Sequence, residues 1–266
     1  MNNPIITLLT DFGTKDHYVA SMKGVILRIN PECTVIDITH HVVPQDIREG
    51  AFLLANAYSY FPKGTIHLSV IDPGVGGPRK PILVTTKNYF FIGPDNGLLT
   101  LAAQKDGIKH IVVLTNKKYF PPEVSATFHG RDIFAPVAGY LSLGVNPKVF
   151  GEKTHYLVEL DSGQPEFKRD QLIGEIIHID NFGNLVSNID QKAFSRFTKN
   201  RTFLIKAGKR IIKGLKRGYW EAKDGELIAI WDSSGFLEIA FREGSAQKVL
   251  KVKRGDPIIV TVISGQ

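Results

Sequence analysis

Charged side chains stand beside glycine-rich turns at several points in the first half of the chain. The run IDPGVGGPR places Asp72 at the end of a predicted strand and Arg79 seven residues beyond it. Its glycines are similar to those of phosphate-binding loops, but neither Gly-Lys-Ser/Thr nor a complete G-x-G-x-x-G before a helix is present. An ion pair that staples the loop is the structural alternative for Asp72 and Arg79. The loop alone leaves both interpretations open.

Two further clusters lie at predicted strand or helix ends. TDFGTKD places Asp11 at the end of the first strand and Asp16 at the start of the following helix. A carboxylate at a strand end can accept hydrogen bonds from a vicinal diol, as in ribose recognition, whereas Asp16 also fits an ordinary helix N-terminus. TFHGRD places His129 directly before a predicted helix. A single histidine is more often structural than catalytic, and with no histidine or carboxylate four residues away we expect no metal site there.

A fourth cluster, IDNFGNLVSN, lies in the last third of the chain. Asp180, Phe182 and Asn184 offer an aromatic face and amide groups that can pair with the edge of a purine. The alternative is a polar β-turn in which asparagine and glycine adopt positive φ.

The elements that must position these groups divide the chain in two. Up to residue 160, short β-rich apolar runs alternate with helical patterns, which predicts an α/β domain with a mainly parallel central sheet. We expect a short helix from Asp95 and another just after His129, with Pro136 near its first turn. Ligands of such sheets bind at the carboxyl ends of the strands, where Asp11 and Asp72 are expected.

The second part begins after a polar stretch, residues 161–170, which we interpret as a linker. Beyond it, residues 171–266 contain apolar runs separated by turn residues at short spacing. This pattern predicts a smaller C-terminal all-β domain of barrel or sandwich type.

Composition limits the classes of protein. The chain has 266 residues, 43% of them hydrophobic, and neither a run of eighteen apolar residues nor a secretory signal is visible, so we expect a cytoplasmic protein without a membrane partner. Its single cysteine, Cys33, excludes an intramolecular disulfide.

The net charge of +7 is concentrated in the last third of the chain. We interpret the basic stretch 206–217 as the exposed face of a β-hairpin, with nucleic-acid binding as the less favoured alternative.

Taken in order, the motifs T-D-F-G-x-x-D, I-D-P-G-V-G-x-x-R, G-P-D-N-G, F-H-G-R-D and D-x-F-G-N carry a resemblance. Together they resemble the S-adenosyl-L-methionine hydroxide adenosyltransferases, the hydrolase branch of the superfamily that includes fluorinases and chlorinases. The resemblance runs from Ile6 to about Glu243. It implies that water or hydroxide attacks the ribose C5′ of S-adenosylmethionine and releases adenosine and L-methionine, without a cofactor.

The resemblance also implies roles for the three candidate catalytic residues. Asp72, Arg79 and His129 would hold and activate the water. A neutral His129 could then accept the proton, a hydrogen bond between its ring N–H and the Asp72 carboxylate could fix its tautomer, and Arg79 could position the water.

The remaining site residues would bind the substrate. Asp11 would bind the ribose hydroxyls, and Asp16 and Ser233 would contact the methionine part. The adenine pocket would be formed by Phe182 and Asn184, with Asp180 lining it. The resemblance further implies a homotrimer, with each site between the α/β domain of one subunit and the β domain of its neighbour.

Two departures from the halogenating relatives bear on the reaction. Those relatives are expected to have an aromatic or hydroxyl-bearing residue where this chain has Asp72, and fluorinases a serine at Gly130. Glycine is also compatible with chlorinases, so the hydrolase interpretation depends on the combination of Asp72, Arg79 and His129.

At the methionine end of the site, Ser234 stands where halogenating members have a basic residue. A chlorinase and a non-catalytic module that binds adenosine or S-adenosylmethionine are the alternatives.

Overall fold

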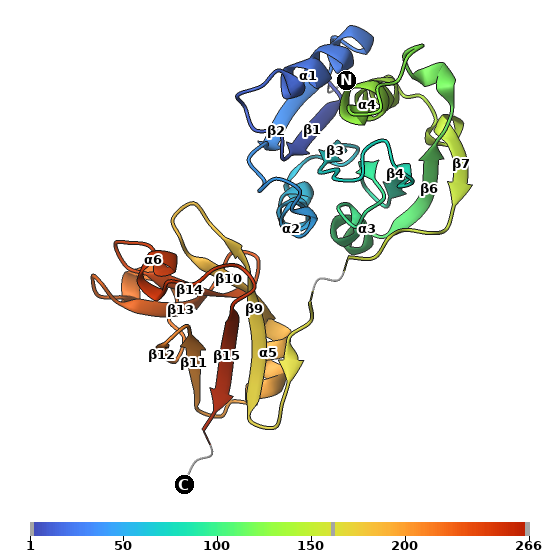
Figure 1. Ribbon diagram of the computed structural model, residues 1–266. Helices are drawn as coiled ribbons and strands as arrows, with labels where there is room; N and C mark the ends of the chain where they lie inside the picture. Colours follow the sequence, from blue (N-terminus) through green and yellow to red (C-terminus); the bar gives the residue numbers. More distant parts are fainter. Residues whose placement is uncertain (1–2, 161–162, 264–266) are drawn as a thin grey trace. The chain divides into compact units, whose positions relative to one another are not determined.

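The chain forms two compact units, Met1–Leu160 and Asp161–Gln266. The computed structural model describes residues 3–160 and 163–263. Figure 1 shows the two units, and each is described by itself.

The first unit alternates strands and helices along the chain, as the sequence predicts. Its elements are β1 (Ile5–Thr10), α1 (Tyr18–Ile29), β2 (Thr34–Thr39), α2 (Ile47–Ala57), β3 (Ile66–Val70), β4 (Pro81–Thr86), β5 (Phe90–Pro94), α3 (Thr100–Asp106), β6 (Ile108–Leu114), α4 (Ala135–Ser142) and β7 (Gly151–Thr154). Short 3-10 helices cover Tyr58–Tyr60, Lys117–Tyr119 and Pro147–Phe150, and a π-helical turn covers Gly130–Phe134.

The sheet of this unit has seven strands in the order β2-β1-β3-β5-β4-β6-β7. Strands β2, β1, β3 and β5 pair in parallel, whereas β4, β6 and β7 extend the sheet by antiparallel pairs. Strand β2 lies on one side of β1 and β3 on the other. The direction in which the chain adds strands to the sheet therefore reverses at β1. Loops that leave a parallel sheet at such a reversal form a crevice for ligands. Asp11 follows β1 and Asp72 follows β3, which places both at this edge.

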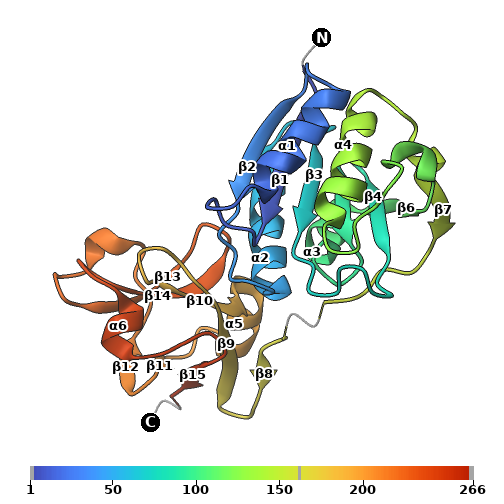
Figure 2. The same cartoon turned by 45° about the horizontal axis from the view of Figure 1, so that its top comes forward.

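Helices cover both faces of this sheet. Helices α1 and α4 pack side by side on one face and enclose a core that includes Met22, Ile26 and Phe134 (Figure 2). Helices α2 and α3 pack on the other face, over a second core that includes Leu54 and Phe91. The predicted α/β fold is confirmed.

One predicted helix begins later than expected. Helix α3 starts at Thr100, not at Asp95. The backbone N–H of Asp95 instead donates to Lys80 O, and the Asn96 side chain donates to Ile71 O. These contacts with distant segments hold Asp95 and Asn96 in a loop. The helix expected after His129 is present, but it opens as a π-helical turn, and Pro136 lies in the first turn of α4 as predicted.

The second unit is built mainly from antiparallel strands. Its elements are β8 (Glu166–Phe167), β9 (Gln171–Ile179), β10 (Leu185–Asp190), α5 (Gln191–Thr198), β11 (Phe203–Ala207), β12 (Arg210–Lys213), a 3-10 helix (Tyr219–Glu221), β13 (Leu227–Trp231), β14 (Phe236–Phe241), α6 (Ala246–Leu250) and β15 (Pro257–Val262).

These strands form one sheet that nearly closes into a barrel. The order is β12-β11-β15-β9-β10-β14-β13, with β8 paired to β9. Beyond β12, the backbone N–H of Lys216 donates to Ala229 O on β13, so the two edges of the sheet approach each other. The predicted barrel-like domain is therefore confirmed. The basic stretch 206–217 contains the predicted hairpin, in which β11 pairs with β12.

Two helices and one strand differ from the sequence prediction. Helices α5 and α6 interrupt the predicted all-β domain; both are short, and α5 buries Phe194 and Phe197 in the barrel core. Within the predicted linker, Glu166–Phe167 forms β8. Residues 161 and 162 of that linker lie outside the described residues.

None of the described helices combines the length and the apolar character needed to cross a membrane.

Candidate functional site

The Asp72–Arg79 loop leaves the sheet at the end of β3. Ile71 is fully buried, which fixes the strand end, and Asp72 is the next residue. Gly76 turns the loop with a φ of +75°, and a β-carbon there would lie 2.3 Å from Ala126 O. Both its conformation and this close approach therefore require glycine. The turn returns the chain to β4 and brings Arg79 back to Asp72.

Asp72, Arg79 and His129 form one connected chain of side chains. Arg79 Nε donates to Asp72 Oδ1 at 2.8 Å, and Arg79 Nη2 donates to Asp72 Oδ2. The same Nη2 lies 2.7 Å from His129 Nδ1. The side chains of Asp72 and Arg79 are only 5% and 10% exposed. The third guanidinium nitrogen, Nη1, is buried without a hydrogen-bond partner among the residues that the structure describes.

This arrangement differs from the hydrogen bonds expected among Asp72, Arg79 and His129. Arg79 stands between Asp72 and His129, so the ion pair considered as a loop staple is present. The imidazole is oriented by its contact with Arg79 and not by the expected hydrogen bond between His129 and the Asp72 carboxylate. A guanidinium can only donate, so His129 Nδ1 accepts and the neutral ring carries its proton on Nε2. In this geometry His129 Nε2 is a hydrogen-bond donor and not a proton acceptor.

The environment of His129 favours the neutral imidazole. Burial lowers the pKa of His129 below its ordinary value, and the charge of Arg79 lowers it further, against weaker opposing effects of Asp72 and Asp132. His129 precedes the π-helical turn, and Asp132 within that turn accepts a hydrogen bond of 2.8 Å from Ser125 N. This bond holds the loop that presents His129.

Asp11 and Asp16 belong to the loop between β1 and α1. Asp11 Oδ2 accepts a hydrogen bond of 2.7 Å from Gln45 N, so the carboxylate is anchored beside the sheet edge. Asp16 is exposed and precedes His17, the N-cap residue of α1. A hollow of about 370 Å³ joins this loop to the segment before His129; it is lined by Phe12, His17, Tyr18, Ser125, Thr127, Phe128 and Arg131.

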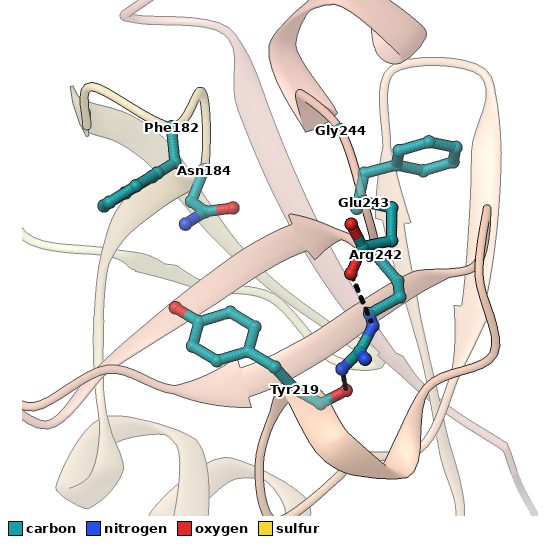
Figure 3. Close-up of a pocket in the computed structure, with 7 residues that line it drawn as sticks. Phe182, Asn184, Tyr219, Arg242, Glu243 and Gly244 are labelled. Atoms are coloured by element: carbon teal, nitrogen blue, oxygen red, sulfur yellow. Dashed lines mark hydrogen bonds and ion pairs between the residues drawn. The ribbon is translucent and has the colours of Figure 1, made fainter.

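The second unit contains a larger pocket of about 430 Å³. Figure 3 shows its walls: Phe182 and Asn184 come from the β9–β10 turn, Tyr219 from a 3-10 helix, and the segment 242–244 from the end of β14. Phe182 is 76% exposed and presents its ring to solvent. Aromatic faces beside an amide suit a purine, which stacks on the rings and pairs through its edge.

Asp180 does not line this pocket but builds the turn that carries it. Asp180 Oδ1 accepts hydrogen bonds from the backbone N–H groups of Phe182 and Asn184, at 2.9 and 2.8 Å. Its Oδ2 accepts from Asn184 Nδ2 at 2.9 Å. Asp180 is thus not among the residues that line this pocket, and the role predicted for it in an adenine pocket stays a prediction. Gly183 in this turn has the positive φ that a polar β-turn predicts.

Ser233 also lies away from the pocket. It is exposed in the turn between β13 and β14, whereas the pocket segment 242–244 follows the other end of β14. Asp232 holds the Ser233 turn by accepting from Ser234 N and Phe236 N.

No group of three histidine, cysteine, aspartate or glutamate side chains that could hold a metal ion occurs in residues 3–160 and 163–263.

Family models match both units in order. The model for the SAM hydroxide adenosyltransferase N-terminal domain matches residues 6–151, and the model for the C-terminal domain matches residues 174–259. The chain belongs to this family. The resemblance read from the five motifs is thus confirmed over both units.

Similar proteins span nearly the whole chain. A protein of Methanocaldococcus jannaschii named "(R)-S-adenosyl-L-methionine hydrolase" is 40% identical over 96% of this chain and 94% of its own length. One of Salinispora tropica with the same name is 37% identical over 97% of this chain and 98% of its own. The crystal structure of an uncharacterized conserved protein from Thermotoga maritima is 38% identical, with a TM-score of 0.89 over 96% of this chain and 99% of that one.

The halogenating relatives are more distant. A protein named fluorinase from an Actinoplanes species is 30% identical over 77% of this chain and 75% of its own length. Within the hydroxide adenosyltransferase family, this chain is therefore more similar to proteins named as hydrolases.

Several pocket residues were not predicted from the sequence. Tyr219, Phe241, Arg242 and Gly244 line the pocket together with Glu243, the residue at which the resemblance ends. The segment 242–244 is a polar run directly after the apolar strand β14, the same signal that drew attention to Asp72 after β3. Tyr219 carried no such signal, because only folding brings its 3-10 helix to β14.

A buried carboxyl group contacts Tyr219 at the wall of this pocket. Glu238 on β14 is 4% exposed, and its Oε1 accepts a hydrogen bond of 2.6 Å from the Tyr219 hydroxyl. Burial raises the pKa of Glu238 to about 7; the Tyr219 hydrogen bond opposes this shift, and the charges of Asp180 and Asp232 add to it. Glu238 therefore changes its charge near neutral pH.

We expect Glu238 to make the second unit less stable as the pH rises toward neutrality. The native state keeps this proton up to a pH of about 7, whereas the unfolded chain loses it near the ordinary value of 4.5. The contribution of Glu238 to the free energy of unfolding is thus fully present below the ordinary pKa. It is lost as the pH rises through the pKa of the native state, and the loss is on the order of 3 kcal/mol. Glu238→Gln, which keeps an acceptor for Tyr219, should remove this pH dependence.

Urea unfolding measured over this pH range tests the expectation. The two tryptophans, Trp220 and Trp231, both lie in the second unit, so their fluorescence reports its unfolding. Asp180, Asp232 and Tyr219 are present in wild type and variant alike, so the two proteins differ only in the carboxyl group of residue 238. Parallel stability curves for the two proteins would contradict the assignment.

Proposed function

We propose that this protein hydrolyses S-adenosyl-L-methionine to adenosine and L-methionine by attack of hydroxide on the ribose C5′. The proposal is supported by the family and by the relatives named as hydrolases over nearly the full length. The observation that carries it is the position of Arg79 between Asp72 and His129, with Nη1 buried and unpartnered within the described residues.

The arrangement suits the binding of hydroxide. In this proposal Arg79 Nη1 and His129 Nε2–H both donate to the hydroxide, and the guanidinium charge favours the anion over water. Asp72 holds the guanidinium through two bonds, which fixes the direction of Nη1. In place of the expected general base, these donors lower the pKa of the bound water, and its proton leaves to solvent.

The reaction then needs no acid at the leaving group. Hydroxide forms the new C5′–O bond while the C5′–S bond breaks. The electron pair of the broken bond stays on sulfur, which becomes the neutral thioether of methionine. Attack of an anion on a sulfonium cation neutralises charge in the transition state, so exclusion of water favours the step. No metal or cofactor enters this proposal.

The substrate parts are assigned to the remaining residues. Asp11, anchored by Gln45, binds the ribose hydroxyls. Phe182 and Asn184 hold adenine in the pocket of the second unit, with Asp180 acting through their turn. We assign the methionine part to Asp16 and Ser233, and we propose that the sites form between subunits of a homotrimer, as the family implies. Cytoplasmic location remains a prediction from composition.

The chlorinase alternative is not favoured, because full-length relatives carry the hydrolase name and the fluorinase is more distant. A non-catalytic binding module is a different class of protein, and tight retention of S-adenosylmethionine without turnover would support it. Nucleic-acid binding by the hairpin 206–217 would be seen as salt-sensitive binding to unrelated DNA or RNA.

A product assay tests the proposed function. Pure protein incubated with S-adenosylmethionine and excess EDTA should release adenosine and methionine in equal amounts. In oxygen-18 water the label should appear in the 5′-hydroxyl of adenosine. Recovery of intact substrate alone would overturn the proposal, and formation of 5′-chloro-5′-deoxyadenosine with excess chloride would replace it by the chlorinase. Gel filtration with light scattering tests the trimer.

A further inference from the structure

The loop between β5 and α3 contacts both ends of the Asp72–Arg79 loop. Asn96 Nδ2 donates to Ile71 O at 2.9 Å, and Asp95 N donates to Lys80 O at 2.8 Å. Ile71 directly precedes Asp72, and Lys80 directly follows Arg79. The two residues of the ion pair thus lie between two anchored backbone positions.

The two anchors differ in kind. The bond from Asp95 N continues the antiparallel ladder of β4 and β5 beyond its last pair, Pro81 with Pro94, so any residue except proline could make it. The bond to Ile71 O comes from a side chain, at a point where the parallel pairing of β3 with β5 has already ended. An amide is needed here, because Asn96 Oδ1 also accepts from Leu98 N at 3.2 Å while Nδ2 donates.

The anchoring loop is itself held from its other side. Asp95 Oδ1 accepts a hydrogen bond of 2.8 Å from Val158 N, and Thr100 Oγ1 donates to Val158 O at 2.6 Å. Gly97 adopts a φ of +98°, and a β-carbon there would lie 3.0 Å from Leu160. With Asp95 only 6% exposed, these bonds are shielded from water. The Asn96 side chain therefore projects from a fixed backbone.

We propose that Asn96 is a positioning residue for catalysis: its bond to Ile71 O fixes the backbone at Asp72 so that Asp72 can hold Arg79 against His129. This inference rests on the proposed function. Between Asp72 and Arg79 the loop contains Gly74, Gly76 and Gly77, which restrict the backbone less than other residues do, so the position of the loop depends on how its ends are fixed. The two-bond contact of Asp72 with Arg79 tolerates little movement of either end.

Asn96→Asp removes the donor and leaves the rest of the side chain unchanged. The aspartate keeps the acceptor for Leu98 N but faces Ile71 O with a carboxylate. Asn116→Asp is the matched control, since Asn116 Nδ2 donates to Val149 O and its Oδ1 accepts from Lys118 N, two residues that belong to neither the Asp72–Arg79 loop nor the π-helical turn after His129. We expect Asn96→Asp to lower kcat about 10- to 100-fold with KM nearly unchanged, and Asn116→Asp to change neither.

A double-mutant cycle separates positioning from a general structural effect. If Asn96 acts through Arg79, Asn96→Asp should change kcat less than about twofold in an Arg79→Met background, because the positioned group is already absent. An equal loss of kcat in both backgrounds would overturn the proposal.

A second measurement does not depend on turnover. Since Arg79 helps to lower the pKa of His129, its displacement in Asn96→Asp should move that pKa back toward its ordinary value. NMR titration of the imidazole, assigned with His129→Gln, should show this rise for Asn96→Asp and not for Asn116→Asp. An unchanged His129 pKa in Asn96→Asp would overturn the inference, whether or not wild type hydrolyses S-adenosylmethionine. Failure of wild type to hydrolyse S-adenosylmethionine would by itself overturn only the proposed function.

Discussion

Arg79→Met is expected to lower kcat for S-adenosylmethionine hydrolysis about 100- to 1000-fold, the usual effect of losing a donor that stabilises charge in a transition state. Methionine fills a similar volume over the Phe134 ring, which lies 5.5 Å from the guanidinium carbon. The substitution removes the charge, the unpartnered Nη1 and the bond to His129 together. Single-turnover measurement of adenosine release would separate the chemical step from product release.

The same variant should also lose stability, which complicates its interpretation. It leaves the Asp72 carboxylate, 5% exposed, without its counter-charge. Removing one partner of a buried ion pair costs about 3–5 kcal/mol, whereas removing both is often nearly neutral. We therefore expect the double variant Asp72→Asn, Arg79→Met to recover much of the lost stability.

The double variant distinguishes the catalytic role from the loop staple. If Asp72 and Arg79 only hold the loop, restored stability should restore turnover as well. If they bind hydroxide, the double variant should fold like wild type and remain at least about 100-fold slower. Recovery of wild-type kcat in the double variant would contradict the proposed mechanism.

His129→Gln is expected to retain turnover within about tenfold of wild type, while His129→Phe should lose about 100- to 1000-fold. Glutamine can present an amide N–H close to where the imidazole has Nε2–H, and phenylalanine fills the space without a donor. A general base would give a different result, because glutamine cannot take up a proton and would cost about 100- to 10,000-fold. Steady-state kinetics of both variants, with melting temperatures as a control for folding, test the assignment.

The pH dependence gives an independent test of the same residue. The pKa of His129 lies below its ordinary value of 6.5 because of burial and Arg79. Acidification through the lowered pKa of His129 should therefore reduce turnover, because protonation of Nδ1 breaks its bond to Arg79. This loss adds to the one that follows when the bound water keeps its proton at low pH. Stability should follow with the same sign, because the unfolded chain binds this proton more readily than the native state.

The part of the acidic fall in kcat that belongs to His129 should be absent from His129→Gln, whose side chain does not titrate, so that only the limb of the bound water is left. An unchanged acidic limb in that variant would assign the limb to another group and would contradict the role given to His129.

The sequence by itself determined where the chemistry can lie along the chain. Alternating strand and helix periodicities placed Asp11 and Asp72 at strand ends, and a parallel sheet brings such ends to one edge. The five motifs indicated the family, because they combine charged residues, a histidine and glycines that the formation of individual strands and helices does not require. The short helices α5 and α6 were missed because five to eight residues carry too little periodicity.

Only the tertiary structure decided which atoms meet. Arg79 and His129 are fifty residues apart, and nothing in their spacing says that the guanidinium lies between the carboxylate and the imidazole. That order makes His129 a donor where sequence reasoning expected a base. Asp180 turned out to serve its own turn, and Asn96 the backbone at Asp72. Local periodicity specifies elements, whereas hydrogen-bond partners are chosen by the packing of elements that are distant in the chain.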